Sequence, residues 1–112
     1  MRKLIETEGG KKAFIDPDSD LTLFYDDLHI PKTSLHLHKT VSGEQIFYLY
    51  YKSNNVVLCE ILEPERALKF VLDNWSGEFT DDDILYYKQF FPFFDKKVLE
   101  TYYSKMNFLR GE

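Results

Sequence analysis

The chain has 112 residues, 44% of them hydrophobic and 17% aromatic, and its 19 acidic and 14 basic side chains give a net charge of −5. The hydrophobic share excludes a disordered chain, and the length supports one hydrophobic core, so we expect a single domain over residues 1–112. The acidic balance, with never more than two adjacent Lys or Arg residues, argues against a protein that binds nucleic acid by neutralising phosphates.

Two features of the sequence bear on its compartment. It contains no apolar run of about 18 residues, which a membrane-spanning helix would need, and its N-terminus lacks the apolar core of a signal peptide. Cys59 is the single cysteine, so no disulfide forms within the chain, and this fits a reducing compartment. We therefore expect a cytoplasmic protein.

The N-terminal part of the chain predicts short strands. Residues 4–5 can add a short edge strand. The apolar residues 12–15 and 21–25 flank the Asp- and Pro-rich residues 16–20, a pattern that predicts two short strands around a turn. Residues 26–31 then predict a loop that leads into the central part of the chain.

The central part predicts three longer strands. Residues 34–41 alternate in character, and residues 44–51 and 56–62 are rich in the aromatic and branched side chains typical of strands. Ser42-Gly43 and the polar residues 52–55 predict tight turns between them, and Gly43 tolerates a positive φ. Together these runs predict an antiparallel meander of about five strands in the first 62 residues or so.

The lengths of the turns set the register of these strands. If Ser42-Gly43 is a two-residue loop, Leu37 lies opposite Tyr48; a two-residue loop in the next turn places Tyr50 opposite Val57 or Cys59. Because successive side chains alternate between faces, one face collects almost wholly apolar residues: Leu35, Leu37, Ile46, Tyr48, Tyr50, Val57, Cys59 and Ile61. The other face is mixed, and we expect it to be covered only in part: His36, His38, Thr40, Phe47, Leu49, Tyr51, Val56, Leu58 and Glu60.

Helical spacing of apolar residues begins after the strands. Residues 64–74 predict an amphipathic helix, because Pro64 suits the first turn and Glu65 complements the positive end of the helix dipole. We expect this helix to fold back over the apolar face of the sheet.

Two more helices are predicted in the C-terminal third. Thr80 can cap a helix over residues 80–91, with the carboxylates of residues 81–83 in its first turn and Pro92 at its end. The apolar residues of this helix are Ile84, Leu85, Tyr87 and Phe91. Asp95 can cap a last helix over residues 95–107. The predicted fold class is therefore α+β, with an antiparallel β-meander packed against three C-terminal helices.

One group of acidic residues has a spacing that can hold a hard cation. Four carboxylates fall at positions 1, 3, 5 and 12 of an EF-hand-like pattern: Asp16, Asp18, Asp20 and Asp27. Position 6 is Leu21, however, where the sharp turn needs glycine, and Pro17 stiffens the loop. We favour an Asp-rich turn without calcium over a calcium site.

A second group suits a transition metal. His36 and His38 share a strand face, so their imidazoles could converge on a metal ion if His29 or Glu60 supplied a third ligand. We favour the interpretation that both are plain surface residues near Phe47.

The sequence contains few candidate catalytic residues or motifs. Cys59 is predicted to lie among apolar side chains, which raise the pKa of a thiol, so we interpret it as a buried structural residue. The sequence contains no phosphate-binding loop, dinucleotide fingerprint or nucleophile elbow. We therefore expect neither an enzyme nor a cofactor.

Acidic and aromatic residues gather in the C-terminal third. Acidic residues at 26–27, 78 and 81–83 could form an electronegative patch among the aromatic residues 79–94. The alternative is that the acids only start a helix and the rings only fill the core. Because the rings are more numerous than one helix face can hold, we predict a partner-binding surface made by Asp81, Asp82, Asp83, Tyr86 and Phe93.

By elimination, these observations predict a small acidic module that binds or inhibits another protein. The partner would be a basic protein, such as a nuclease or other nucleic-acid-handling protein. Small acidic, aromatic-rich domains occur among bacterial toxin-immunity proteins and phage-encoded inhibitors, and the likeness is one of type, with no shared motif. The alternatives are a self-associating homodimer, formed through an exposed edge strand or the spare rings, and a His-based metal-binding protein.

Overall fold

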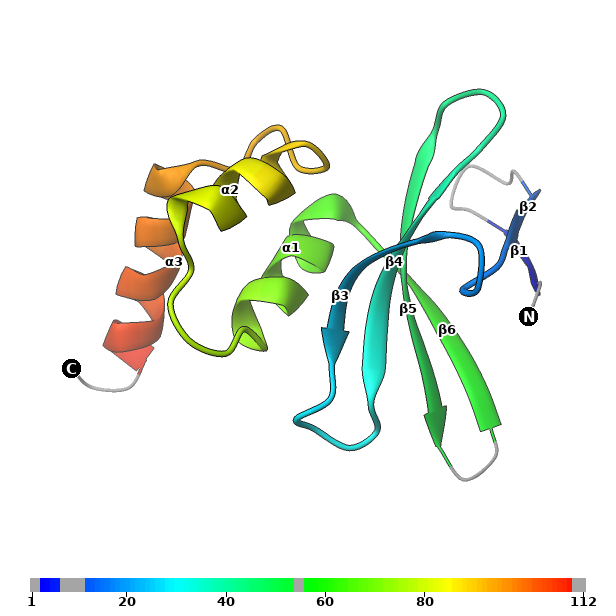
Figure 1. Ribbon diagram of the computed structural model, residues 1–112, viewed down its shortest axis with the longest axis horizontal. Coiled ribbons are helices and arrows are strands. Elements are labelled where there is room, and N and C mark those ends of the chain that lie inside the picture. The colour runs from blue at the N-terminus through cyan, green and yellow to red at the C-terminus, as the bar shows by residue number, and fades with distance from the viewer. Residues whose placement is uncertain (1–2, 7–11, 54–55, 110–112) are drawn as a thin grey trace. The chain divides into compact units, whose positions relative to one another are not determined.

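A computed structural model of the chain describes residues 3–6, 12–53 and 56–109 (Figure 1). The chain divides into two compact units, Met1–Asn74 and Trp75–Glu112. That residues 1–112 form a single domain stays a prediction.

Six strands precede three helices in the described residues, so the predicted α+β fold is confirmed. The strands are β1 (Lys3–Glu6), β2 (Lys12–Ile15), β3 (Leu21–Asp26), β4 (Thr33–Lys39), β5 (Gln45–Ser53) and β6 (Val56–Leu62). The helices are α1 (Pro64–Asp73), α2 (Asp81–Lys88) and α3 (Lys96–Leu109).

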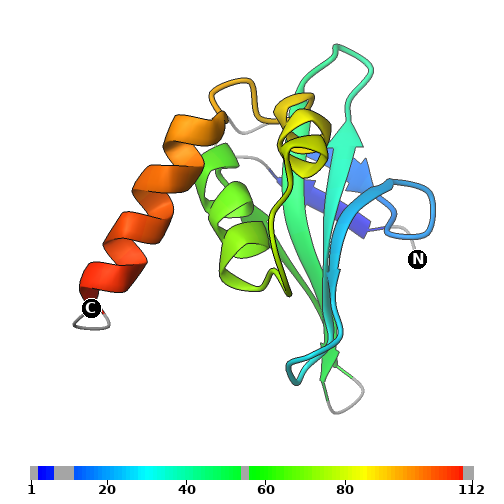
Figure 2. The same ribbon diagram turned by 60° about the vertical axis from the view of Figure 1, so that its left-hand side comes forward.

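The strands of the N-terminal unit form two sheets. β3, β4, β5 and β6 pair in that order as an antiparallel meander, and β1 and β2 form a separate two-stranded hairpin. The strands on either side of residues 16–20 therefore belong to different sheets. In Figure 2, α1 (green) lies on one side of the meander and the β1–β2 hairpin (blue) lies on the other.

The predicted register between β4 and β5 is wrong by one residue, since His36 pairs with Tyr48 and Leu37 pairs with Phe47. The reason is the length of the turn. Thr40 N–H donates to the Glu44 carbonyl at 2.9 Å and Gly43 N–H donates to the Thr40 carbonyl at 2.9 Å, which encloses a three-residue loop. Gly43 has the predicted positive φ, at 90°.

This one-residue shift divides the predicted apolar face between the two sides of the sheet. The face of the sheet that α1 covers, which we call the helix face, carries Leu35, Leu37 and Phe47. Phe24 pairs with Leu35 and lies on the same face, where its ring centroid is 5.9 Å from that of Phe70 in α1. The opposite face, which lies toward the β1–β2 hairpin and which we call the hairpin face, carries His36, Ile46, Tyr48, Tyr50, Cys59 and Ile61.

The pairing of β5 with β6 agrees with the second of the two predicted alternatives, because Tyr50 lies opposite Cys59 and not opposite Val57. Residues 54–55 of that loop, and the side chain of Val56, lie outside the described part of the chain. Ile61 was predicted to be a core residue, but its position on the edge strand leaves it 39% exposed.

Both faces of the sheet contribute to the core of the N-terminal unit. α1 contacts β5 and β6, and Pro64 occupies its first turn as predicted. The face that α1 covers is only partly the predicted one, because Ile46, Tyr48, Tyr50, Cys59 and Ile61 lie on the hairpin face. The buried apolar residues of this unit are Ile15, Leu23, Leu35, Leu37, Ile46, Phe47, Tyr48, Leu62, Ala67, Leu68, Val71 and Leu72. The residues predicted for the mixed face are covered only in part, as expected, since His36 and Phe47 are buried while Leu58 and Glu60 are exposed.

The C-terminal unit has the predicted helix starts. Thr80 caps α2 through a reciprocal pair of bonds with Asp83, and Asp95 Oδ1 accepts from Val98 N–H at 2.8 Å at the start of α3. α2 ends at Lys88, before the predicted boundary, and the Tyr87 carbonyl accepts from two following N–H groups as the chain turns. This turn brings Phe91 and Phe94 into the interior of the unit.

Candidate functional site

The residues predicted to bind a partner lie on α2 and in the turn that follows it. Asp81 and Asp82 are exposed in the first helical turn. Asp83 has a structural task, because its Oδ2 accepts the Thr80 N–H at 2.8 Å and the Thr80 hydroxyl at 2.8 Å. Only the first two carboxylates are therefore fully available to a partner.

α2 has an exposed stripe that includes large apolar side chains. Asp82, Leu85, Tyr86 and Gln89 follow the i, i+3, i+4, i+7 spacing of one helix face, and all are exposed. Leu85 is 65% exposed and Tyr86 is 41% exposed. Sequence reasoning grouped Leu85 with Ile84 and Tyr87 as apolar residues of this helix, but at about 100° per residue Leu85 lies away from the buried side chains of Ile84 and Tyr87.

Phe93 lies in the turn after α2 and is 42% exposed, with its ring centroid 6.0 Å from that of Phe91. We call Asp81, Asp82, Leu85, Tyr86 and Phe93 the α2 surface. It combines two exposed carboxylates with three large exposed side chains. The carboxylates can attract a positively charged partner during association, and the large side chains can be buried in the complex.

Most of the neighbouring rings fill the core, as the alternative interpretation held. Phe79, Tyr87, Phe91 and Phe94 are buried. Phe79 is central, with its ring centroid 4.5 Å from that of Trp75 and 5.8 Å from that of Phe94. The aromatic excess is therefore mainly packing, and the exposed part is smaller than the composition suggests.

Asp26 was included in the predicted electronegative patch but is unsuited to it. Its side chain is 4% exposed, and it accepts the Leu28 N–H at 3.1 Å and lies 2.8 Å from His29 Nδ1. This carboxylate fixes the start of the loop between β3 and β4.

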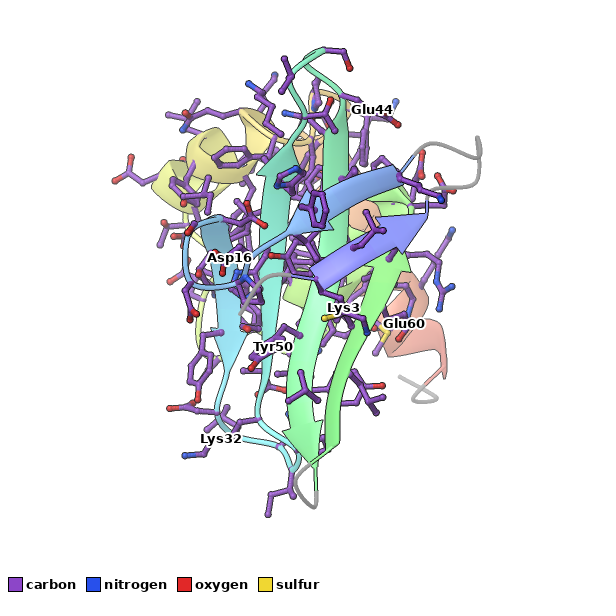
Figure 3. All side chains as sticks on the ribbon, turned by 90° about the vertical axis from the view of Figure 1, so that its right-hand side faces the viewer. Lys3, Asp16, Lys32, Glu44, Tyr50 and Glu60 are labelled. Atoms are coloured by element: carbon purple, nitrogen blue, oxygen red, sulfur yellow. The ribbon has the colours of Figure 1, made fainter. Side chains whose placement is uncertain are left out.

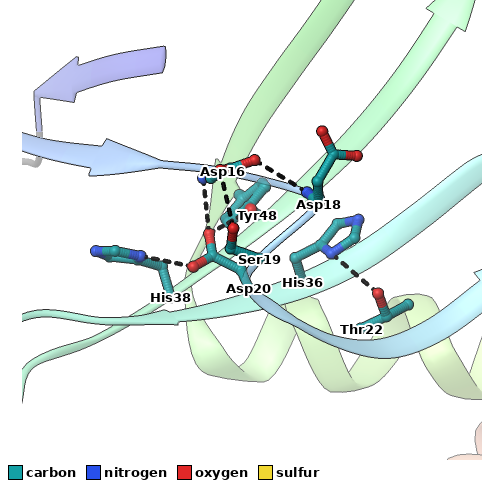
Figure 4. Close-up of polar contacts among 8 residues, drawn as sticks. All are labelled: Asp16, Asp18, Ser19, Asp20, Thr22, His36, His38 and Tyr48. Carbon is teal, nitrogen blue, oxygen red and sulfur yellow. Dashed lines mark hydrogen bonds and ion pairs between the residues drawn. The ribbon is translucent and has the colours of Figure 1, made fainter. Parts of the chain in front are cut away.

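A second cluster, which we call the Asp20 network, lies on the hairpin face of the sheet (Figure 4). Asp20 Oδ2 accepts the Tyr48 hydroxyl at 2.6 Å and the Asp16 N–H at 2.9 Å, and Asp20 Oδ1 lies 2.8 Å from His38 Nδ1. The sequence presented the Asp-rich turn and the His-x-His pair as separate candidates. The fold brings them together because the turn between β2 and β3 lies over β4 and β5.

His36 completes this polar cluster from within the sheet. It is buried, its ring stacks on Tyr48 with centroids 5.2 Å apart, and its two nitrogens contact the hydroxyls of Ser34 at 2.6 Å and Thr22 at 3.3 Å. The interpretation of this histidine as a surface residue near Phe47 is wrong, because Phe47 lies on the opposite face.

The contacts of these histidines bear on the metal hypothesis. Three of the four ring nitrogens of His36 and His38 already contact oxygen atoms of the chain. Glu60 lies on the helix face, away from both rings, and His29 contacts Asp26. Within residues 3–6, 12–53 and 56–109, no group of three or more His, Cys, Asp or Glu residues is arranged to hold a metal ion.

The Asp-rich turn bonds to itself instead of forming an open cation loop. Asp16 accepts the Asp18 N–H at 3.1 Å and the Ser19 hydroxyl at 3.0 Å. Asp27, at position 12 of the EF-hand-like spacing, follows the extended strand β3 and so lies roughly 20 Å along the chain from the turn.

Burial and hydrogen bonds shift the acidities of this cluster. Burial alone would raise the pKa of Asp20, but the bonds from Tyr48, Asp16 and His38 outweigh it and hold that pKa below its ordinary value. Burial, reinforced by Asp20, raises the pKa of Tyr48, so the hydroxyl keeps the proton it donates. Burial lowers the pKa of His36, against the opposing charge of Asp20.

Cys59 is half-buried on the hairpin face instead of fully buried. Burial raises the pKa of its thiol, in the direction that the sequence predicted.

The lowered pKa of His36 predicts a loss of stability in mild acid. As the pH falls below about 6.5, the unfolded chain takes up a proton that the folded chain resists. The contribution of His36 is therefore intact above that pH, falls below it, and stops changing once the pH passes the lower pKa of the folded state. We expect urea unfolding between pH 7.5 and pH 5 to show this fall in the parent protein and a smaller fall in His36→Asn. An equal fall in both proteins would contradict the assignment.

Comparison of the chain with protein-family models, with curated proteins and with solved structures gives no match. Across the described residues, no helix is long and apolar enough to cross a membrane. Function is therefore inferred from the chain's own surface and contacts.

Proposed function

We propose that this protein is a small acidic module that binds, and thereby inhibits, a basic protein partner through the α2 surface. It would act as immunity proteins and phage-encoded inhibitors do, in the cytoplasm and without catalysis. The observation that carries the proposal is the exposure of Leu85 and Tyr86 directly beside Asp81 and Asp82 on one short helix.

Packing within the unit does not account for the exposed apolar side chains. α2 contributes its other stripe, Ile84 and Tyr87, to the core, so Leu85 and Tyr86 are left outward. Burying a side chain of this size in an interface contributes about 1.5–3 kcal/mol before the costs of association. Tyrosine is among the residues most often found as anchors of protein complexes, so Tyr86 is the main candidate anchor.

The charges favour a basic partner. Three carboxylates occupy the first turn of α2, and its basic residue, Lys88, stands at the opposite end of the helix. The whole chain carries a net charge of −5, which adds long-range attraction toward a positive surface. Acidic groups of this kind speed the approach of a partner more than they slow its departure.

The Asp20 network supports a structural role for the polar residues of the N-terminal unit. Its hydrogen bonds join groups of the chain to one another and tie the Asp-rich turn to β4 and β5. A satisfied network of this kind stabilises one arrangement of the chain, which suits a rigid binding module.

The test begins with affinity capture from a lysate of the source organism, using the parent protein and the Leu85→Ala, Tyr86→Ala double variant as parallel baits. A partner that acts through the α2 surface should be captured by the parent and lost from the variant. Kinetics with the purified partner should then separate the two kinds of residue. We expect Asp81→Asn with Asp82→Asn to slow association about tenfold at low salt and to weaken its salt dependence.

Removing an apolar anchor should act on dissociation instead. Tyr86→Ala or Phe93→Ala should speed dissociation up to about 30-fold, the equivalent of about 2 kcal/mol. Asp83 is left unchanged in these variants, because its loss would also remove the helix cap. The matched control, Glu65→Gln with Glu100→Gln, removes the same charge from exposed positions of the other two helices and should leave association nearly unchanged. The proposal would be refuted if both double variants slowed association equally. It would also be refuted if the Leu85→Ala, Tyr86→Ala bait captured the partner as well as the parent protein does.

A further inference from the structure

β6 forms one edge of the four-stranded sheet. Within the described residues it pairs with β5 alone, in continuous register along its whole length. Because bonded and non-bonded pairs alternate along an antiparallel ladder, every second residue of β6 presents its N–H and C=O away from β5. Figure 3 shows Glu60 on this strand at the margin of the sheet.

The opposite edge of the sheet, β3, is protected in ways that β6 is not. β3 carries a bulge between Thr22 and Phe24, which interrupts the regular row of backbone groups that another strand would need. β6 has no bulge, no proline and no lysine, and six of its seven residues are apolar. A long, regular, apolar edge is the kind to which a further strand adds.

Apolar side chains are exposed on both sides of this edge. Leu58, on the helix face, is 41% exposed and Ile61 lies on the hairpin face. A molecule that docked on one face would cover only one of them. A strand added in the plane of the sheet would flank both, so the exposure pattern favours strand addition.

We propose that the occupant of this edge is a second copy of the chain, with the two β6 strands paired antiparallel about a two-fold axis. The two sheets would then form one continuous sheet of eight strands. β6 runs from Val56 to Leu62, so full overlap places its midpoint, Cys59, opposite the partner's Cys59.

Charge selects the same register. With Cys59 at the centre, Leu58 lies opposite the partner's Glu60, and the two glutamates are kept apart. Centring the pair on Glu60 would set two carboxylates opposite each other, which destabilises a strand pair, and would shorten the overlap. Val57 and Ile61, both on the hairpin face, also become neighbours across the axis. The edge is thus complementary to itself in one register.

This inference concerns the N-terminal unit and the α2 surface belongs to the C-terminal unit, so the dimer and the proposed function can fail separately. Sedimentation and light scattering at about 50 μM should give twice the monomer mass of 13.4 kDa. Leu58→Glu places like charges opposite each other twice in the interface and should give a monomer. Leu58→Lys changes the same exposed position but faces the partner's Glu60, so this variant should remain a dimer.

Oxidation provides a second measurement, made on the parent protein itself and independent of the Leu58 variants. Directly opposite residues of antiparallel strands have Cα atoms about 4.5–5.5 Å apart, a distance that a disulfide can span. Diamide should therefore convert the parent protein into a covalent dimer that dithiothreitol reverses, and Cys59→Ser should not form it. A monomeric parent protein would overturn the proposal. A Leu58→Glu variant that remains a dimer would also overturn it. If that variant does not fold, a parent dimer that diamide fails to cross-link would overturn it instead.

Discussion

Replacing Tyr48 with alanine is expected to lower the free energy of unfolding by about 3–5 kcal/mol. The side chain is fully buried at the centre of the hairpin face, where its ring stacks on His36 and its hydroxyl donates to Asp20 at 2.6 Å. The substitution leaves a cavity under the hairpin and removes a donor from a carboxylate that is held ionised. Urea unfolding followed by far-ultraviolet circular dichroism would measure the loss.

Ile61 provides the matched control, because it pairs directly with Tyr48 across the sheet. Its exposure in the single chain predicts that Ile61→Ala costs less than about 1 kcal/mol when both variants are unfolded at a protein concentration low enough to keep them monomeric. A two-residue turn between β4 and β5 would instead have grouped both side chains with Leu35 and Leu37 in a single core. Equal losses for the two variants would contradict the register described above.

The second large effect is expected in the C-terminal unit, where Phe94→Ala should cost about 3–5 kcal/mol. Phe94 is fully buried and meets the edge of Phe79, which in turn contacts Trp75. Trp75 is the single tryptophan of the chain, so its fluorescence reports on the unfolding of this unit. The denaturation midpoint observed by tryptophan emission should fall markedly in the variant.

Phe93→Ala is the control for this prediction, since it removes the same atoms one position earlier. Phe93 is partly exposed, and its loss should lower stability by less than about 1.5 kcal/mol while still weakening partner binding. If Phe93→Ala were as destabilising as Phe94→Ala, the assignment of Phe93 to the surface would be wrong.

The helices were the part of the fold that the sequence predicted best, because their signals are local. Thr80 and Asp95 lie within three residues of the N–H groups that they cap, and Pro64 marks a first turn by its own geometry. Such signals do not depend on how distant segments pack. The end of α2 was predicted three residues too late, because it depends on the burial of Phe91 and Phe94 in the core and not on a local signal.

The strand register was harder to predict because β4 and β5 are buried on both faces. When one face of a sheet is exposed to solvent, its polar residues identify it, and a register that is wrong by one residue would place them in the core. Here Leu37 and Phe47 are buried on one side and His36 and Tyr48 on the other, so two registers look equally apolar. The length of the loop at Gly43 decided between them.

The candidate site was predictable in part. The exposure of Asp81, Asp82, Tyr86 and Phe93 agrees with a surface role, and helical spacing could also have identified Leu85. The burial of Asp26 and the contact of Asp20 with His38 depend on tertiary structure, and no spacing along the chain encodes them.

The Asp20 network also constrains the order in which the chain can become structured. Asp20 and Tyr48 are 28 residues apart in sequence, and Asp20 and His38 are 18 apart. During synthesis the Asp-rich turn leaves the ribosome well before β5, so its carboxylate stays hydrated until Tyr48 has emerged and β4 and β5 have paired. Closing so long a loop has an entropic cost that local hairpins avoid. The N-terminal hairpin, although made first, can dock on the sheet only after the strands beneath it have formed.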